Sequence, residues 1–394
     1  MLPAEPTRPR ARDDALARNP GIDLLRGLAI VFVLLNHLGL PMRMPLKASA
    51  LADVLPVRLL QALNYNGYEA VFVFFVISGF LIAGNALERW GTLARIDLRA
   101  FYARRFARIV PCLLALVVVL AVLHGLGVEG YVIDRPGQSL GGAMLAALGL
   151  HLNWYEGRTG YLPGNWDVLW SLSIEEVFYL GFPLVCLLTR RTRVLAPLLL
   201  VLALSLPWTR AALEGNEIWQ EKAYLPGMAA IATGILGALW LGHRPRPTPR
   251  ACRALRWGGA LGLLAATLGG HWLWPLLHQG VMLLLTGSTL ALLVALRSAP
   301  PRVPRAARWL CSWGRLSYEI YLSHMFVVFA IVGLYRFSGA EPRSAFLWYL
   351  PAFVLSWGLG ALVARWLSLP CERWLRRRWL HAAPGAAEAA CRPG

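Results

Sequence analysis

Long apolar runs, separated by short polar and basic segments, repeat along almost the whole chain. About 20 consecutive apolar residues cross a bilayer as one helix, so runs of this length predict membrane spans. A further apolar segment, 139–152, is short for a full crossing, and we expect it to be re-entrant or to lie at the membrane interface. The pattern predicts ten spans, at 22–40, 67–86, 105–126, 168–188, 194–209, 225–242, 256–272, 276–297, 316–336 and 346–369.

Basic residues fall mainly between alternate spans, and this distribution predicts the orientation of the chain. Short cytoplasmic segments of membrane proteins carry an excess of Lys and Arg. If 139–152 crossed the membrane fully, every later segment would be inverted and the later basic clusters would lie outside. The charges therefore favour ten spans. With ten spans and both termini in the cytoplasm, the clusters that lie inside are 190–193, 244–256, 297–315 and 376–378.

The composition supports the same class of protein. The chain of 394 residues is 57% hydrophobic and 15% charged, which fits an all-α integral membrane protein. Its net charge of +18 does not indicate nucleic-acid binding, because the arginines lie in short clusters between apolar runs and not on one face of a soluble domain. The six cysteines show neither CxxC pairing nor metal-ligand spacing, so we expect plain thiols and no metal site.

The pattern divides the chain into a cytoplasmic tail (1–20), a transmembrane domain (21–372) and a second cytoplasmic tail (373–394). The first tail is polar and shows no apolar core followed by a small-residue cleavage site, so we expect the first span to act as an uncleaved targeting signal. The second tail starts with basic residues, and its small-residue composition from 381 onward predicts disorder.

The first predicted span carries Asp23, Arg26, Asn36 and His37 inside an apolar run. A charged residue at the centre of a lipid-exposed helix costs about 2.5–3.5 kcal/mol, so ionisable residues in spans usually face a protein interior or a wet cavity. Arg26 and His37 lie about 16 Å apart along one helix, close to three turns, and can face the same interior. Equally, Arg26 can snorkel to a headgroup while His37 bonds a neighbouring helix. This run alone leaves both interpretations open.

The second and third spans each carry a polar feature with two interpretations. Ser78 and Gly79 permit close approach between helices, and packing is the ordinary role of such a small pair. Arg105 and Arg108 lie on one helix face just inside the cytoplasmic boundary. Guanidinium groups there suit phosphate binding as well as simple anchoring, and the depth of Arg108 favours the functional interpretation.

The fourth and ninth spans add carboxylates, a tyrosine and a histidine. Glu175 and Glu176 are costly in an apolar helix unless Arg, His or water meets them. The ninth span contains Tyr321 and His324, and a lone histidine there is most often structural. Because it recurs with the other polar positions, we expect these helices to surround one central polar cavity.

Taken in order, these motifs resemble the membrane-bound acyltransferase 3 family. The first span matches the family's pattern of arginine, ten residues and histidine at Arg26 and His37. The chain differs from the family's pattern in two places. It has Ser and Met beside His324, where the family often has tryptophan. It also shows no C-terminal SGNH-type hydrolase domain, which some members carry. The other matches are FFVISGFLI at 74–82, RRFARIVP at 104–111, WSLSIEEVFY at 170–179 and LSYEIYLSH at 316–324.

The resemblance implies transfer of an acyl group, often acetyl, from cytosolic acyl-CoA to a hydroxyl of a glycan or of another envelope or exported acceptor, in a bacterial inner membrane. It implies that Arg26, Arg105 and Arg108 hold the phosphates of CoA. His37 acts either as a general base or as a short-lived acyl-histidine, and both mechanisms stay open.

The same resemblance implies supporting roles for the other polar positions of the spans. Glu176 or Glu175 orients the imidazole of His37 or stabilises its charged form. The residues expected to line the site, to bind the donor or acceptor, or to donate to an oxyanion are Ser78, Tyr179, Asp23, Trp170, Tyr321 and His324.

Two other classes of function stay open. A transporter or flippase for a lipid-linked or acylated sugar also needs charged spans and a wet cavity, although no inverted repeat is visible. A non-catalytic scaffold of an envelope-polymer complex is the third hypothesis. The expected partners are acyl-CoA, a saccharide and membrane lipid, and the sequence leaves a homo-oligomer open.

Overall fold

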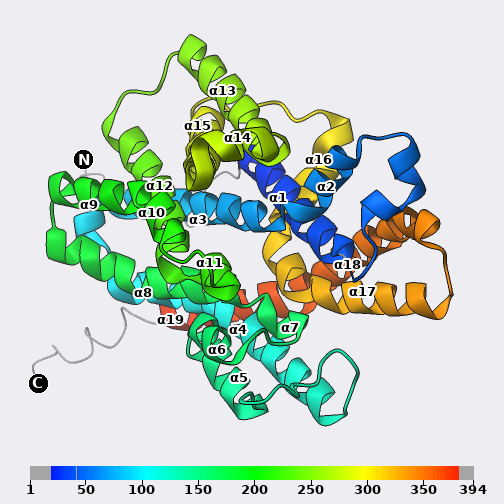
Figure 1. Cartoon of the computed structure of the whole chain (residues 1–394). Helices are drawn as coiled ribbons and strands as arrows, with labels where there is room; N and C mark the ends of the chain where they lie inside the picture. The colour runs from blue at the N-terminus through cyan, green and yellow to red at the C-terminus, as the bar shows by residue number, and fades with distance from the viewer. Residues whose placement is uncertain (1–18, 41, 381–394) are drawn as a thin grey trace, which may run out of the picture.

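The described residues of the chain form helices throughout (Figure 1). The computed structural model describes residues 19–40 and 42–380, so the predictions for most of the first tail and for 381–394 lie outside the described residues. Within the described part, eight helical segments are long and apolar enough to cross a membrane. The all-α prediction is confirmed for the described residues, and the eight segments suit an integral membrane protein.

Each predicted span coincides with a helix, but two of these helices do not qualify as spans by length and composition. One of them, α9, has only 13 residues, and the other, α13, begins with three arginines in its first eight residues. The count of ten and the orientation therefore stay predictions. The helices at the predicted spans are α1 (Pro20–Gly39), α3 (Gly67–Trp90), α4 (Leu98–Gly125), α8 (Trp170–Thr189), α9 (Thr192–Leu204), α12 (Tyr224–His243), α13 (Pro249–Leu268), α15 (Val281–Ser298), α17 (Ser317–Phe337) and α18 (Tyr349–Val363).

Shorter helices connect these elements. The apolar segment 139–152 forms α5 (Leu140–Leu148) and the start of α6 (Leu152–Thr159), and nine residues of helix extend only about 13 Å, too short for a crossing. A π-helical turn, Ala364–Ser368, joins α18 to α19. The other short helices are α2 (Val57–Tyr65), α7 (Gly164–Asp167), α10 (Leu206–Ala211), α11 (Glu217–Lys222), α14 (Gly270–Leu277), α16 (Arg308–Arg315) and α19 (Leu369–Leu380).

Helix α1 lies among α3, α16 and α17, and its start is fixed by a capping interaction. The side chain of Asn19 accepts hydrogen bonds from the backbone N–H groups of Gly21 and Ile22, while Pro20 occupies the first helical turn. A Cβ on Gly27 would lie 2.0 Å from the backbone oxygen of Leu310, so only glycine permits this approach of α1 to α16. The packing fixes the position and rotation of the helix that carries Arg26 and His37.

The close approach expected at Ser78 and Gly79 occurs where α3 crosses α12. A Cβ on Gly79 would lie 2.0 Å from the backbone oxygen of Ile231, and one on Gly234 would lie 2.0 Å from that of Val76. The two backbones therefore meet through glycine on both sides, as small residues allow in membranes. Figure 1 shows α3 crossing the middle of the molecule.

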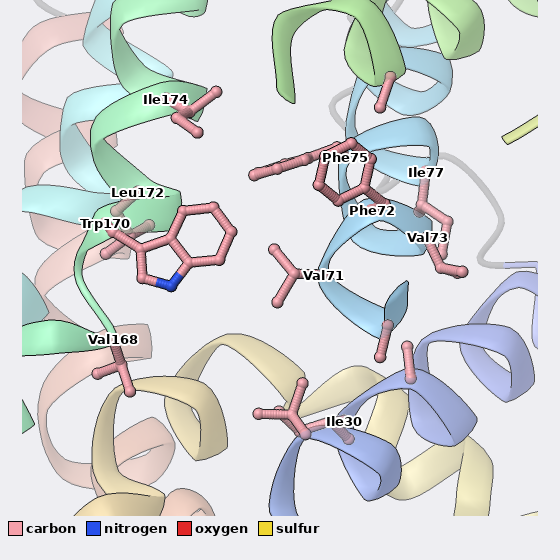
Figure 2. Packing of buried hydrophobic residues seen from close by; sticks show 14 of the residues in the cluster. Ile30, Val71, Phe72, Val73, Phe75, Ile77, Val168, Trp170, Leu172 and Ile174 are labelled. Atoms are coloured by element: carbon pink, nitrogen blue, oxygen red, sulfur yellow. The ribbon is translucent and has the colours of Figure 1, made fainter. Parts of the chain in front are cut away.

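Apolar side chains of α3 and α8 pack together beside this crossing. Figure 2 shows the ring of Trp170 on α8 facing Phe75 and Val71 on α3. The ring of Trp170 is edge-on to Phe75 at 6.1 Å and stacks on Tyr68 at 6.2 Å. Trp170, which we expected to bind substrate, thus belongs to the hydrophobic core that holds α8 against α3.

Candidate functional site

One cavity of about 780 Å³ runs between the central helices. Val71 and Arg89 of α3 both line it, and eighteen residues of helix separate them by about 27 Å, so the cavity extends through much of the thickness of a bilayer. Most of its lining residues lie at one end, where α1, α4 and α17 begin and where α3 and α15 end, and we call this end the wide part.

The walls of this cavity are strongly basic. Nine arginines face it against only four carboxylates, those of Asp23, Glu88, Glu175 and Glu372. An excess of guanidinium groups in a partly enclosed space attracts a polyanionic ligand. The arginines are Arg26, Arg89, Arg104, Arg105, Arg108, Arg297, Arg315, Arg373 and Arg376.

Arg108 is held by two carboxylates from different helices. Its guanidinium lies 2.8 Å from Glu319 of α17 and 3.4 Å from Glu372 of α19. It also donates to the hydroxyl of Ser368 in the π-helical turn, and that hydroxyl in turn donates to Glu319 at 2.6 Å. Glu319 is almost fully buried, so Arg108 compensates a carboxylate that could not remain charged alone.

Arg105 belongs to a second polar cluster, between α3, α4 and α8. Its guanidinium lies over the ring of Tyr179 at 3.7 Å and 3.5 Å from the Glu176 carboxylate. The hydroxyl of Tyr179 is hydrogen-bonded to that of Ser78. Glu175 lines the cavity and interacts electrostatically with Arg105. The structure thus brings these five predicted residues together.

Arg26 lies on the α1 wall of the cavity and contacts the start of α17. Its Nε and Nη2 atoms donate to the hydroxyl of Ser317 at 3.2 and 2.8 Å. Asp23, one turn earlier, also lines the cavity and is buried. Both predicted residues therefore lie near the wide part of the cavity, with Arg105 and Arg108 on the other walls.

Tyr321 and Ser171 line the opposite end of the cavity, which has fewer lining residues and which we call the narrow end. The Tyr321 hydroxyl is 2.7 Å from the Ser171 hydroxyl and donates to the backbone oxygen of Val168 at 2.9 Å. The ring of Tyr321 is 5.9 Å from that of His324, on the next turn of α17. This tyrosine therefore lies between the cavity and the histidines behind it.

The two predicted histidines lie side by side, with ring centroids 5.1 Å apart. His324 is completely buried, whereas His37 keeps some exposed surface. The backbone oxygen of His37 accepts a hydrogen bond from Arg43 at 2.5 Å. Neither histidine is among the residues that line the cavity. The pair joins α1 to α17 just beyond the narrow end.

The glutamates do not reach His37 among the described contacts. The charged or titratable neighbours of His37 are His324, Arg43 and Lys222, whereas Glu176 pairs with Arg105. The physical reason is that a guanidinium neutralises a buried carboxylate more effectively than a neutral imidazole does. The expected orientation of His37 by Glu175 or Glu176 is therefore without a supporting contact.

Lys222 forms the centre of a charged cluster that the sequence did not single out. Its ammonium lies 2.8 Å from Glu156 and also pairs with Asp167, and all three residues lie on the side of the histidines away from the wide part of the cavity. The Glu156 carboxylate also accepts from the backbone N–H of Leu162 at 2.9 Å. In the sequence, Lys222 directly precedes an apolar run, which is the ordinary position of a lysine at a membrane interface, and nothing there indicates its partners.

Burial changes the acid–base behaviour of the groups around this cluster. Burial, helped by the neighbouring Asp167 carboxylate, raises the pKa of Glu156 well above its usual range, and Lys222 only partly offsets this. Burial lowers the pKa of the Arg43 guanidinium to about 10. A protonated Glu156 beside the Lys222–Asp167 pair leaves the smallest net charge buried in the cluster.

Replacing Lys222 is expected to destabilise the protein more than replacing Glu156. Lys222→Met leaves the Asp167 charge without its partner, a change that costs about 3–5 kcal/mol in buried pairs. Glu156→Gln keeps a neutral polar group of the same shape and should cost less than half as much. Thermal unfolding of the detergent-solubilised protein measures both, and equal losses for the two variants would contradict this account.

Comparison with known proteins gives a family match and several relatives. An acyltransferase domain model, that of the acyltransferase 3 family, matches residues 19–365. The peptidoglycan O-acetyltransferase OatA of Listeria monocytogenes is 28% identical over 216 residues, which is 53% of this chain and 29% of the relative. The O-acetyltransferase OatA of Staphylococcus aureus is 30% identical over 177 residues, or 42% of this chain and 24% of the relative.

A further relative, a putative O-acetyltransferase of Staphylococcus aureus, is 27% identical over 174 residues. The matches span less than a third of the length of these relatives. No solved structure matches the chain.

Proposed function

This chain belongs to the acyltransferase 3 family, and from that premise we propose that it transfers an acetyl group from acetyl-CoA to a hydroxyl of an envelope glycan. We further propose that it does so in a bacterial inner membrane. The names of the relatives support the O-acetylation of a glycan and give no support to a transporter or flippase.

The observation that carries the proposal is the basic cavity that leads toward His37. Acetyl-CoA combines a compact polyphosphate head with a long, thin arm that ends in the thioester. The nine arginines of the cavity suit the head, and a length of about 27 Å suits the arm. No described carboxylate is among the close charged neighbours of His37, so a neutral imidazole is available there.

The arginines divide into two groups in this proposal. Arg105 and Arg108 already compensate buried carboxylates, so their positive charge contributes to the potential of the cavity more than to direct phosphate contacts. Four arginines that line the cavity are exposed, and of these Arg297 pairs with Glu88. The other three, Arg89, Arg315 and Arg373, are better placed to bind phosphate. Arg26 is the last residue of α1 that lines the cavity on the way to His37.

The orientation follows from the same distribution of charge. The helix ends around the wide part belong to the segments with the basic clusters that favour the cytoplasm. We therefore place the opening of the cavity in the cytoplasm, where acyl-CoA is made. The histidine pair and the Lys222 cluster then lie toward the outer face, from which an envelope glycan approaches.

At the narrow end, His37 supplies the reactive nitrogen of the proposed reaction. It either accepts the proton of the attacking hydroxyl or takes the acetyl group itself, and both routes are chemically sound. The Ser171 hydroxyl, which donates to the Tyr321 hydroxyl at the end of the cavity, would donate to the thioester oxygen by turning its hydrogen toward the bound donor as negative charge develops there.

Loss of the exposed arginines should weaken CoA binding. Arg89→Gln and Arg315→Gln each remove one charge-assisted contact, and we expect each to raise the Kd for CoA about tenfold, since such contacts contribute about 1.5–3 kcal/mol. Arg190→Gln, a surface arginine outside the cavity, is the matched control. Titration calorimetry on the purified protein measures all three, and unchanged affinity in both cavity variants would overturn the donor assignment.

His37→Ala should abolish acetylation without abolishing CoA binding, because the histidine lies beyond the narrow end of the cavity. Cells lacking the gene, complemented with wild type or with this variant, are compared by mass spectrometry of their envelope glycans. We expect one acetyl ester to be restored only by wild type, with a rate loss of about 10³ or more in vitro. Full acetylation with the variant would exclude His37 as the reactive group.

A further inference from the structure

The hydrogen bonds of His324 define which of its nitrogens carries the proton. Nδ1 lies 2.7 Å from the backbone oxygen of Tyr321 and 3.2 Å from that of Ile320. A carbonyl oxygen only accepts, so Nδ1 must carry the hydrogen. In the neutral ring, Nε2 then presents a lone pair on the side that faces away from the backbone of α17.

Nε2 of His324 has no hydrogen-bond partner among the residues that the structure describes, although the whole side chain is buried. A buried acceptor without a partner of the protein is free to accept from a donor that a ligand brings. A lone pair needs a donor, and the proposed reaction brings a hydroxyl donor to this place. The imidazole of His37, 5.1 Å away, is the neighbour with which that hydroxyl would react.

We propose that His324 is a second catalytic histidine, the base for the acceptor hydroxyl, while the partly exposed His37 carries the acetyl group. This inference rests on the proposed function and deepens it. Each histidine serves one substrate: His37, on the helix that also bears Arg26, serves the donor, and His324 serves the acceptor. The acetyl group then passes from CoA to His37, and from His37 to an acceptor hydroxyl that lies beside His324.

The steps balance without any further reagent. A ring nitrogen of His37 attacks the thioester carbon, the C–S bond breaks, and the CoA thiolate leaves with the proton of the other ring nitrogen. The acceptor oxygen then attacks the acetyl carbon while its proton passes to Nε2 of His324. The C–N bond to His37 breaks, and the proton on His324 returns to the departing His37 nitrogen, so both imidazoles end neutral.

His324→Asn separates this role from a structural one. The asparagine amide can still donate to the two backbone oxygens, but it has no group at the position of Nε2. The full chain, purified in detergent, is assayed in two ways. Exchange of label between acetyl-CoA and free CoA measures the half-reaction with the donor. Transfer of the acetyl group to an N-acetylglucosamine oligomer or to water measures the half-reaction with the acceptor.

We expect His324→Asn to keep exchange within about threefold of wild type and to lower both transfer and acetate release by at least about a hundredfold. His37→Asn should lose both half-reactions. Met325→Leu, at an equally buried neighbouring position on α17, is the matched control and should keep both. If His324→Asn does not fold, His324→Gln takes its place in the same assays.

Three results would overturn the inference. In the folded His324 variant, these are transfer at the wild-type rate, or an equal loss of exchange and of transfer. In the wild-type protein, it is transfer to the acceptor without any exchange of label between acetyl-CoA and CoA. The last result would leave the proposed function intact and exclude the acetyl-histidine. Wild-type protein that neither exchanges label nor transfers it from acetyl-CoA would instead refute the proposed function, and this inference with it.

Discussion

Glu319 of α17 is almost fully buried and cannot stay charged among apolar helices without a positive group beside it. Arg108 of α4 supplies that group and also pairs with Glu372 of α19. The pairing ties α4 to α17 and α19 at one point, and the π-helical turn before α19 brings Ser368 into the same network. Arg105 and Glu176 do the same for α4 and α8. These ion pairs lie at the wall of the basic cavity, which Arg105, Arg108 and Glu372 line.

Helix α1 connects this charged region with the chemistry. Glycine contacts hold it tightly against α16, so the distance between Arg26 and His37 is set by a rigid helix. The helix places one end at the wide part of the cavity and the other beside His324. The distance between a donor bound at the arginines and the reactive nitrogen of His37 is then fixed. Catalysis by proximity and orientation requires such a fixed distance.

Much of the fold could be predicted from the sequence, because apolar runs of bilayer length have few alternatives to helix. The site could be predicted only in part. Isolated polar residues in spans indicate a shared interior but not their partners: Glu176 faces Arg105 and not His37, and Trp170 completes the core. Lys222 was missed because its partners, Glu156 and Asp167, come from a segment more than fifty residues earlier in the chain, and only folding brings them to it.

The central claim is that the thioester of a bound acyl-CoA reaches the end of the cavity beside the histidines. An acyl-CoA with a photoreactive diazirine in a short acyl chain tests it directly, with the labelled peptides identified by mass spectrometry. The account predicts labelling of the end of α1 around His37 and of α17 around Tyr321 and His324, and it predicts that excess CoA prevents this labelling. Label confined to the exposed arginine region, or label that CoA does not displace, would contradict the account.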